Sequence, residues 1–342
     1  MARFKKAKDI KVGVIGYGGA FNMGKSHLNQ MKEAGMTPVA VAEIDAARLK
    51  VAEEDFPGIE TYGSVAKMLK DSDVNLITII TPHNTHAKLA LQCLKAGKSV
   101  CCEKPLAITT AECDAMIREA KKRKLVLTTY HNRHWDGCIL EAVNQIKKKK
   151  VIGDVYKATA HMGGHGQPGD WWRSSKSISG GINYDWGVHL LEYCLQIMDG
   201  NIQEVSGFIR EGFWKTAWKK DTYEDEGFIV TRFDNGQWMT LTNTHLDSRA
   251  RSHIVEFTGT KGTYLMDGRG YTLIQKQDGK TITTNGRNCA GQQAKYYQNV
   301  ADHLVKGKEL VISAEWSRRP IHILDLGDRS ARAGKAIKAK YA

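Results

Sequence analysis

The chain has 342 residues, which is long for one domain and suits two. Hydrophobic residues make up 42% and charged residues 25%, and no stretch approaches the roughly 20 apolar residues of a transmembrane helix, so we expect a soluble globular protein and no membrane partner. The formal net charge is +13, but no basic patch is interleaved with aromatic residues along one element, so we expect a solvated basic surface and no nucleic-acid partner.

The N-terminus and the cysteines indicate the compartment. The first apolar run leads straight into Gly16 without a cleavage site, so we interpret it as a strand of the mature protein and not as a signal peptide. The seven cysteines contain no CxxC pair, and most of them lie within apolar patterns. Buried free thiols in a reducing environment explain this distribution best, and we expect a cytoplasmic protein.

Strand and helix patterns alternate over the N-terminal part of the chain. Short apolar runs, typical of parallel strands covered on both faces, occur at 10–15, 39–42, 76–80, 99–102 and 125–129. Helical patterns lie between these runs and follow cap-type residues at Asp45, at Ser64 and at Thr109, where Glu112 completes a capping-box spacing. This alternation predicts βαβ units and a doubly wound parallel sheet.

The pattern changes after about residue 150. Longer runs of alternating polarity predict an antiparallel sheet with one packed face and one open face, and the Asn235-Gly236 pair predicts a hairpin between two of its strands. Helical patterns interrupt or follow this sheet at 186–198, 294–306 and 329–339. We therefore expect a domain boundary between residues 131 and 150.

A glycine-rich turn follows the first predicted strand. Gly16 and Gly18 stand two apart, and a helical pattern comes after them. Such a turn lets the backbone approach a pyrophosphate, which then lies at the positive end of the helix. Phe21 replaces the third glycine of the usual pattern, and Gly24 could take its place after a short insertion. By itself the pattern also fits an ordinary turn.

An acidic residue ends the second predicted strand. A carboxylate there accepts hydrogen bonds from the ribose hydroxyls of the adenosine and repels a 2′-phosphate, so Glu43 favours NAD over NADP. The alternative is a solvated strand-end residue, and Arg48, which follows shortly after, leaves NADP open.

Two further patterns carry candidate chemistry. Lys104 follows the fourth predicted strand, at the edge where open α/β sheets bind ligands, and a desolvated lysine can hold a hydroxyl or carbonyl oxygen. Asp185 and His189 stand four apart, so a helix that begins near Asp185 would place both on one face, where a carboxylate can support a proton-accepting imidazole. The alternatives are a surface lysine before a turn proline and a helix cap beside an ordinary histidine.

These motifs together resemble the Gfo/Idh/MocA oxidoreductase family. The resemblance rests on the GYGG turn at 16–19, Glu43, TPHNTH at 81–86, EKPL at 103–106, GGINYDWGVH at 180–189 and GTKGTY at 259–264, in this order. It implies an N-terminal Rossmann domain over residues 1–133 with a doubly wound parallel sheet. It also implies a C-terminal α/β domain over residues 134–342 with a large open, mostly antiparallel sheet, and NAD, less favourably NADP, bound between the domains.

The resemblance also implies roles for individual residues. His189 would be the general base that takes the proton of a substrate hydroxyl, Lys104 would hydrogen-bond the oxygen, and Asp185 would orient the substrate and tune His189. The expected cofactor contacts are Gly16, Gly18, Gly19, Ala20, Glu43, Thr81, Pro82, His83, Asn84, His86, Glu103 and Lys104. Phe21 is the clearest departure from the family pattern.

The expected substrate side includes a tryptophan-rich loop. Trp172 and Arg173 match a Trp-Arg step of the family, and aromatic faces and arginines bind sugar rings and their oxygens. The residues expected to contact substrate are Lys104, Tyr130, His131, Arg133, His165, Trp172, Arg173, Asn183, Asp185 and His189. The histidine pairs 131/134 and 161/165 do not define a metal-ligand spacing, so we expect no metal site.

We therefore expect an NAD-dependent oxidoreductase that transfers a hydride between nicotinamide and a hydroxyl-bearing carbon of a sugar, glycoside or cyclitol. The alternative is a glycosidase that oxidises its substrate transiently, eliminates the aglycone and re-reduces the product with the same NAD, with Tyr184 or His165 as the base. A third class is a non-catalytic NAD-binding subunit. The presence of the candidate catalytic residues Lys104, Asp185 and His189 disfavours it. The apolar alternation of the second-domain sheet predicts a homodimer or homotetramer formed through that sheet.

Overall fold

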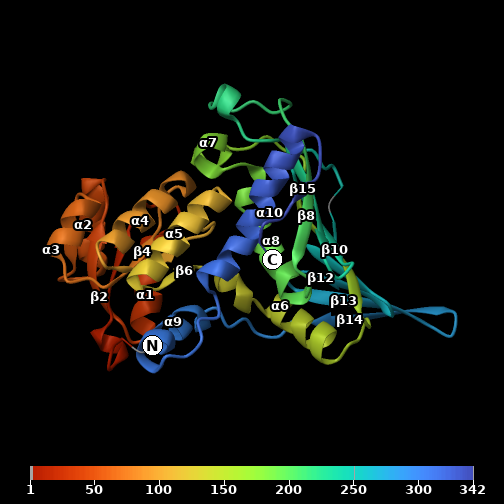
Figure 1. Cartoon of the computed structure of the whole chain (residues 1–342), viewed down its shortest axis with the longest axis horizontal. Coiled ribbons are helices and arrows are strands. Elements are labelled where there is room, and N and C mark those ends of the chain that lie inside the picture. Colours follow the sequence, from red (N-terminus) through yellow and green to blue (C-terminus); the bar gives the residue numbers. More distant parts are fainter. Residues whose placement is uncertain (1–2, 250, 342) are drawn as a thin grey trace. The chain divides into compact units, whose positions relative to one another are not determined.

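The computed structural model describes residues 3–249 and 251–341, and the chain divides into two compact units (Figure 1). The first unit comprises the described residues up to His131 together with Ala294–Arg318. The second comprises Asn132–Gln293 together with the described residues from Arg319 on. The sequence placed everything after residue 133 in the second domain, whereas residues 294–318 group with the first unit.

A six-stranded parallel sheet forms the centre of the first unit, with the strand order β3-β2-β1-β4-β5-β6. Its strands are β1 (Lys11–Ile15), β2 (Thr37–Ala42), β3 (Glu60–Tyr62), β4 (Leu76–Ile79), β5 (Ser99–Cys102) and β6 (Leu127–Thr129). All residues of β4 and β5 are buried, which explains why these strands are continuously apolar or small. The predicted doubly wound sheet is confirmed, and the strand order reverses between β1 and β4.

Helices connect these strands and cover the sheet (Figure 1). They are α1 (Met23–Glu33), α2 (Ala46–Asp55), α3 (Val65–Asp71), α4 (His86–Lys95), α5 (Thr110–Arg123) and, from the C-terminal segment, α9 (Lys295–Lys306). The three predicted caps are present: Asp45 and Ser64 accept hydrogen bonds from the first turns of α2 and α3, and Thr109 forms a capping box with Glu112 at α5.

Two tyrosines explain why α9 belongs to the first unit. Tyr296 and Tyr297 are each 1% exposed, and the Tyr297 hydroxyl lies 2.7 Å from Nδ1 of His27 and 3.1 Å from Oγ1 of Thr78. Tyr130 packs against both tyrosine rings. This aromatic cluster joins segments far apart in the chain, which local sequence patterns do not reveal.

A nine-stranded mixed sheet forms the centre of the second unit, with the order β14-β13-β12-β11-β7-β10-β9-β8-β15. The strands are β7 (Val155–Gly163), β8 (Ile202–Arg210), β9 (Glu226–Phe233), β10 (Trp238–Thr244), β11 (Val255–Gly259), β12 (Gly262–Met266), β13 (Gly270–Gln277), β14 (Lys280–Arg287) and β15 (Ile337–Lys338). The pairing of β7 with β10 is parallel and the other pairings are antiparallel. The predicted Asn235-Gly236 hairpin joins β9 to β10.

One face of this sheet packs under helices α8 (Gly187–Ile197) and α10 (Ala314–Ala333). Shorter helical segments of the unit are α6 (Gly137–Ala142), continued by a π-helix over Val143–Lys148, and α7 (Lys176–Ser179). The predicted helix over 329–339 is wrong in its bounds, because the left-handed Gly334 follows the end of α10 and residues 337–338 pair with β8 as β15. Within the described part of the chain, no helix is both long and apolar enough to cross a membrane.

We predict that β8 and α10 depend on two facing glycines. A Cβ on Gly207 would overlap the carbonyl oxygen of Gly327, and the backbone of each residue is held in regular structure, in β8 and in α10. Gly207→Ala should therefore lower the free energy of unfolding by about 2 kcal/mol, as measured by urea denaturation. Gly268→Ala, where a Cβ meets no described atom within 4 Å, serves as the control. Equal stability of the two variants would contradict this packing.

Candidate functional site

The glycine-rich turn has the shape that a phosphate ligand requires. Gly16 has a φ of +99°, and a Cβ there would overlap the carbonyl oxygen of Ile80. A Cβ on Gly18 would meet no heavy atom of the described residues within 4 Å, so ligand atoms can approach this backbone. Helix α1 begins at Met23, directly after the exposed residues Gly19 and Ala20 and a short loop, and its N-terminus attracts negative charge.

Gly24 provides the close packing that the usual third glycine supplies. A Cβ on Gly24 would come within 2.5 Å of the Tyr17 ring and 3.0 Å of the carbonyl oxygen of Gly16. A side chain there would push α1 away from the turn. Phe21, at the sequence position of the missing glycine, is 57% exposed, so the inserted residues loop outward and the contact is kept.

Glu43 follows the end of β2 and braces the turn. Its carboxylate accepts hydrogen bonds from the backbone N–H groups of Tyr17 at 2.6 Å, Ile44 at 2.7 Å and Asp45 at 3.1 Å. Arg48 donates from Nε to the Tyr17 carbonyl oxygen at 2.8 Å. Side chains of both charges, one from the end of β2 and one from α2, therefore support the glycine-rich turn that follows β1.

The loop after β4 is pinned by a buried histidine. His86 is 1% exposed, with Nδ1 2.7 Å from the carbonyl oxygen of Pro105 and Nε2 2.8 Å from that of Thr81. Burial lowers the pKa of His86, against the opposing effect of the two carbonyl groups. His83 is also buried, whereas Asn84 is exposed and Pro82 half-buried. The histidines of this motif therefore support the loop, and its other residues form the surface.

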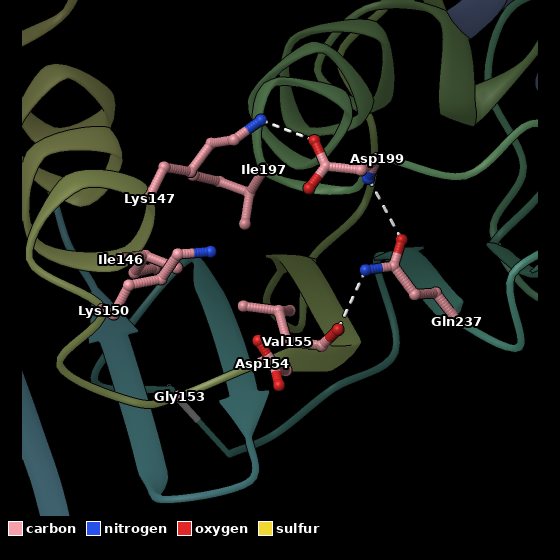
Figure 2. A pocket seen from close by; sticks show the side chains of 9 residues that line it. All are labelled: Ile146, Lys147, Lys150, Gly153, Asp154, Val155, Ile197, Asp199 and Gln237. Atoms are coloured by element: carbon pink, nitrogen blue, oxygen red, sulfur yellow. Dashed lines mark hydrogen bonds and ion pairs between the residues drawn. The ribbon is translucent and has the colours of Figure 1, made fainter.

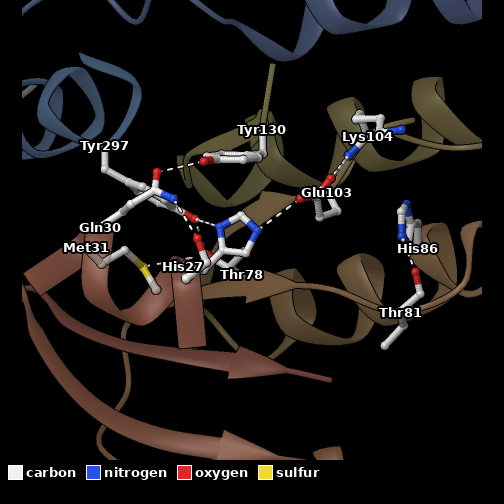
Figure 3. A network of polar contacts seen from close by, with 11 residues as sticks. His27, Gln30, Met31, Thr78, Thr81, His86, Glu103, Lys104, Tyr130 and Tyr297 are labelled. Carbon is white, nitrogen blue, oxygen red and sulfur yellow. Dashed lines mark hydrogen bonds and ion pairs between the residues drawn. The ribbon is translucent and has the colours of Figure 1, made fainter. Parts of the chain in front are cut away.

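The turn after β5 carries Glu103 and Lys104 on a polar network (Figure 3). The peptide bond between Lys104 and Pro105 is cis. Oε1 of Glu103 lies 3.0 Å from Nε2 of His27, and Oε2 accepts a hydrogen bond from the Lys104 backbone N–H at 2.9 Å. Burial raises the pKa of Glu103, but contact with His27 and the Lys104 charge outweigh it, so the pKa lies below its ordinary value.

The structure places Tyr130 and His131 inside the first unit, although the sequence assigned both to the substrate. Tyr130 is 3% exposed, and its hydroxyl donates to Oε1 of Gln30 at 2.7 Å (Figure 3). Its ring packs against His27 with the centroids 4.3 Å apart, and His131 is completely buried. Tyr130 is therefore buried because it belongs to the aromatic cluster that packs α9 against the first unit.

In the second unit, Asp185 and His189 flank the start of α8. Asp185 follows the short 3₁₀-helix Ile182–Tyr184, and Trp186 is the N-cap of α8. His189 lies in the first turn, is 5% exposed, and its ring contacts that of Trp186 with the centroids 5.7 Å apart. Asp185 is therefore half-buried just before the helix and not on it.

A pocket of about 320 Å³ lies beside Asp185. Its polar and aromatic lining includes Gln167, Trp171, Arg173, Asp185, Trp186, Tyr223, Asn243 and His245. Among the residues predicted to contact substrate, Arg173 and Asp185 line this pocket. Asn183 is buried behind it and accepts a hydrogen bond on Oδ1 from Asn243 at 2.8 Å.

Arg173 is held between two tryptophans at this pocket. Its guanidinium carbon lies 4.5 Å from the Trp171 ring centroid and 4.6 Å from that of Trp172, and its Nε is 3.5 Å from Oδ1 of Asp185. Trp171 is 40% exposed. Exposed aromatic faces beside a fixed arginine and a carboxylate can bind the carbon face and hydroxyl groups of a sugar ring.

Sequence reasoning missed a tyrosine–histidine pair in the pocket lining. The Tyr223 hydroxyl lies 2.6 Å from Nε2 of His245. Burial, together with the nearby Asp185 and two further carboxylates, raises the pKa of Tyr223, while burial lowers that of His245. Tyr223 precedes β9 and His245 follows β10, and these strands are antiparallel neighbours. The sequence signal that could have indicated this pair is the position of two polar residues near the open end of the predicted hairpin.

Arg133 and His165 lie against aromatic rings of the second unit. Arg133 forms an ion pair with Asp136 at 3.0 Å and lies 4.8 Å from the Trp186 ring centroid. The His165 ring contacts Trp214 with the centroids 5.5 Å apart. Across residues 3–249 and 251–341, no three His, Cys, Asp or Glu side chains are grouped so that they could hold a metal ion.

A smaller hollow in the second unit is braced by its own side chains (Figure 2). It measures about 100 Å³. Lys147 forms an ion pair with Asp199 at 2.6 Å, and Gln237 accepts a hydrogen bond from the Asp199 backbone at 3.0 Å and donates to the Val155 carbonyl oxygen at 2.8 Å. Because these groups satisfy one another, we assign this hollow no ligand.

Two carboxyl groups of the second unit, those of Glu224 and Asp328, are close enough for one to raise the pKa of the other. Glu224 is 2% exposed; it pairs with Lys176 at 2.5 Å and accepts the Ile182 backbone N–H at 3.1 Å. Burial and the charge of Glu224 raise the pKa of Asp328 to about 6. A carboxyl group with a raised pKa binds its proton more tightly in the folded state, so it lowers stability increasingly as the pH rises toward that pKa.

We predict that Asp328→Asn stabilises the fold more at pH 8 than at pH 5, with a difference of about 1 kcal/mol in the free energy of unfolding. The substitution removes a negative charge that destabilises the folded state. Asp328 carries this charge fully only at pH values above its pKa in the folded state. Chemical denaturation at the two pH values measures it. Asp302→Asn is the control of opposite sign, because two lysines lower the pKa of Asp302 to about 2. Removing the Asp302 carboxylate should therefore destabilise the fold. A pH-independent effect of Asp328→Asn would contradict the assignment.

Comparison with known proteins relates both units to one family. Residues 10–131 match the Gfo/Idh/MocA model described as an oxidoreductase family with an NAD-binding Rossmann fold, and residues 140–265 match the Gfo/Idh/MocA C-terminal domain. A scyllo-inositol 2-dehydrogenase (NADP(+)) of Bacillus subtilis is 22% identical over 98% of each chain. A myo-inositol 2-dehydrogenase of Thermotoga maritima is 28% identical over 79% of this chain and 78% of its own. The solved structure of an NAD-binding protein from Listeria innocua superimposes with a TM-score of 0.81, at 26% identity and 97% coverage of both chains.

Proposed function

This chain belongs to the Gfo/Idh/MocA family of oxidoreductases with an NAD-binding Rossmann fold, and from that premise we propose that it transfers a hydride between NAD and a hydroxyl-bearing carbon of a sugar, glycoside or cyclitol. The observation that carries the proposal is the pocket of the second unit, in which Arg173 stacks on tryptophans beside Asp185. The names of two relatives, both inositol dehydrogenases, support the same substrate class.

The first unit provides the proposed cofactor contacts. The turn at Gly16 and Gly18, with Gly19 and Ala20, would hold the pyrophosphate, and Glu43 would face the adenosine ribose. Thr81, Pro82, Asn84 and the turn at Glu103 and Lys104 would form the nicotinamide side, with His83 and His86 beneath them. When bound, NAD accepts or returns the hydride, and the reaction needs a separate path for the hydroxyl proton.

The chain's own residues would supply that path. In the proposed arrangement His189 takes the proton from the substrate hydroxyl, and Asp185 orients the substrate and supports the imidazolium that forms. Lys104 donates a hydrogen bond to the same oxygen and stabilises the negative charge that develops on it. Arg173 and Trp172, with Arg133 and His165 of the same unit, would fix the ring. Tyr223 and Asn243 join them, because both line the pocket.

We also propose a cytoplasmic location, on the state of the cysteines. All seven are thiols, and six of them are buried. Burial raises the pKa of Cys93 and Cys101 to about 12, so these thiols are protonated and unreactive. A reducing compartment suits such a chain.

The function is tested by incubating the protein with NAD and a panel of inositols, aldoses and aryl glycosides. We expect NADH to accumulate with at least one sugar or cyclitol, as read from the absorbance of reduced nicotinamide. The same samples are assayed for a released aglycone. Release without net NADH would show the glycosidase outcome instead, and neither signal across the panel would contradict the proposal.

The control for this test is His189→Ala. It removes the proposed base and leaves the glycine turn unchanged, so turnover should fall about 100-fold or more while NAD affinity changes little. Fluorescence titration with NADH measures the affinity. Turnover at the wild-type level in this variant would contradict the role of His189 as the base.

The open face of the nine-stranded sheet supports a proposal about assembly. Strand residues that point away from α8 and α10 include Phe208 and Trp238, which are 60% and 38% exposed. We propose that a second copy covers this face, in a homodimer or homotetramer. Light scattering at micromolar concentration should give two or four times the chain mass of 38.1 kDa. Phe208→Asp should reduce that mass, unlike Ile44→Asp in the first unit, and a wild-type monomer would contradict the proposal.

A further inference from the structure

We propose that His27 is a positioning residue for Lys104 and that it acts through the carboxylate of Glu103. The inference rests on the proposed function only where turnover is measured. His27 lies in α1, the helix that begins at the glycine-rich turn, and it is completely buried. Figure 3 shows its ring between Tyr297 of α9 and Glu103.

The hydrogen bonds of this network have one consistent direction. An ionised carboxylate only accepts, so Nε2 of His27 donates to Oε1 of Glu103 at 3.0 Å. With its N–H on Nε2, the ring accepts at Nδ1, where the Tyr297 hydroxyl lies 2.7 Å away and donates. Oε2 of Glu103 accepts the backbone N–H of Lys104 at 2.9 Å. The chain therefore runs from Tyr297 through His27 and Glu103 to Lys104.

Each oxygen of Glu103 thus has a separate task. The side chain of Glu103 is 14% exposed, so its carboxylate relies on protein donors more than on water. His27 fixes one oxygen and thereby orients the other toward the Lys104 backbone. Without His27, the carboxylate loses its buried donor, and the charge of Lys104 becomes its main remaining stabilisation. Lys104 would then be held by Glu103 and less able to act on a substrate oxygen.

A double-substitution cycle tests this coupling. His27→Leu and Glu103→Gln should each lower kcat about 10- to 100-fold, the usual range for residues that orient a functional side chain. The double variant should lose no more than Glu103→Gln alone, because His27 acts only through that carboxylate. His27→Gln keeps an N–H donor and should recover part of the activity. Effects that multiply in the double variant would overturn the proposal.

A second readout needs no turnover and so separates this inference from the proposed function. The wild-type protein, the two single variants His27→Leu and Glu103→Gln, and the double variant are acetylated with acetic anhydride at pH 8. The modification of Lys104 is followed by mass spectrometry of the peptide that contains it. We expect His27→Leu to slow acetylation of Lys104 about tenfold in the presence of Glu103 and to have little effect in the Glu103→Gln background. An unchanged Lys104 rate in His27→Leu would overturn the proposal, whatever the substrate panel shows.

The matched control is His303→Leu. This histidine lies in the same unit and its Nδ1 contacts the Lys308 carbonyl oxygen at 2.6 Å, on the surface of α9. It should leave turnover and Lys104 acetylation at wild-type values. Thermal unfolding and NADH affinity are measured for each variant. If His27→Leu does not fold, His27→Gln takes its place in the cycle, with a smaller expected loss and the same non-additive outcome.

Discussion

A side chain at Gly16 would overlap the backbone of Ile80, and this steric constraint determines what the first unit can bind. Because β1 and β4 run parallel as neighbours, the turn after β1 has to pass close to the turn after β4. Only glycine fits there, and its left-handed φ turns the chain into α1. Gly24 then lets α1 pack on Gly16 and Tyr17, which sets the helix N-terminus beside the open backbone at Gly18.

The second unit meets a different constraint, which is the cost of placing charge around a pocket. Arg173 is stacked on two aromatic rings and paired with Asp185, while Glu224 is buried with Lys176 and a backbone donor. Such pairing offsets part of the cost of taking charged groups out of water. Asp328 shows the limit of this arrangement, because the nearby Glu224 raises its pKa to about 6. The charges that face the pocket are thus held by one another and by the tryptophans beside them.

Local patterns in the sequence predicted the elements well, since strands, caps and the hairpin at Asn235 each depend on neighbouring residues. They failed where a distant contact decides the outcome. Residues 294–318 join the first unit because Tyr296 and Tyr297 fill its core, and Tyr130 is buried for the same reason. Tyr223 and His245 belong to no motif, and only the pairing of β9 with β10 brings them together.

Residues within one motif also divide into two kinds that sequence alone cannot separate. In the TPHNTH segment, His86 lies under the loop and binds the carbonyl oxygens of Thr81 and Pro105, while Asn84 faces outward. In the EKP turn, Glu103 holds the backbone of Lys104. A functional group on a turn is useful only if the turn is rigid, because small errors in its position weaken its action on a ligand. Two buried histidines, His27 from α1 and His86 from α4, contact this turn at Glu103 and at Pro105. Their hydrogen bonds hold the turn in place, which explains why polar residues of these motifs lie in the interior.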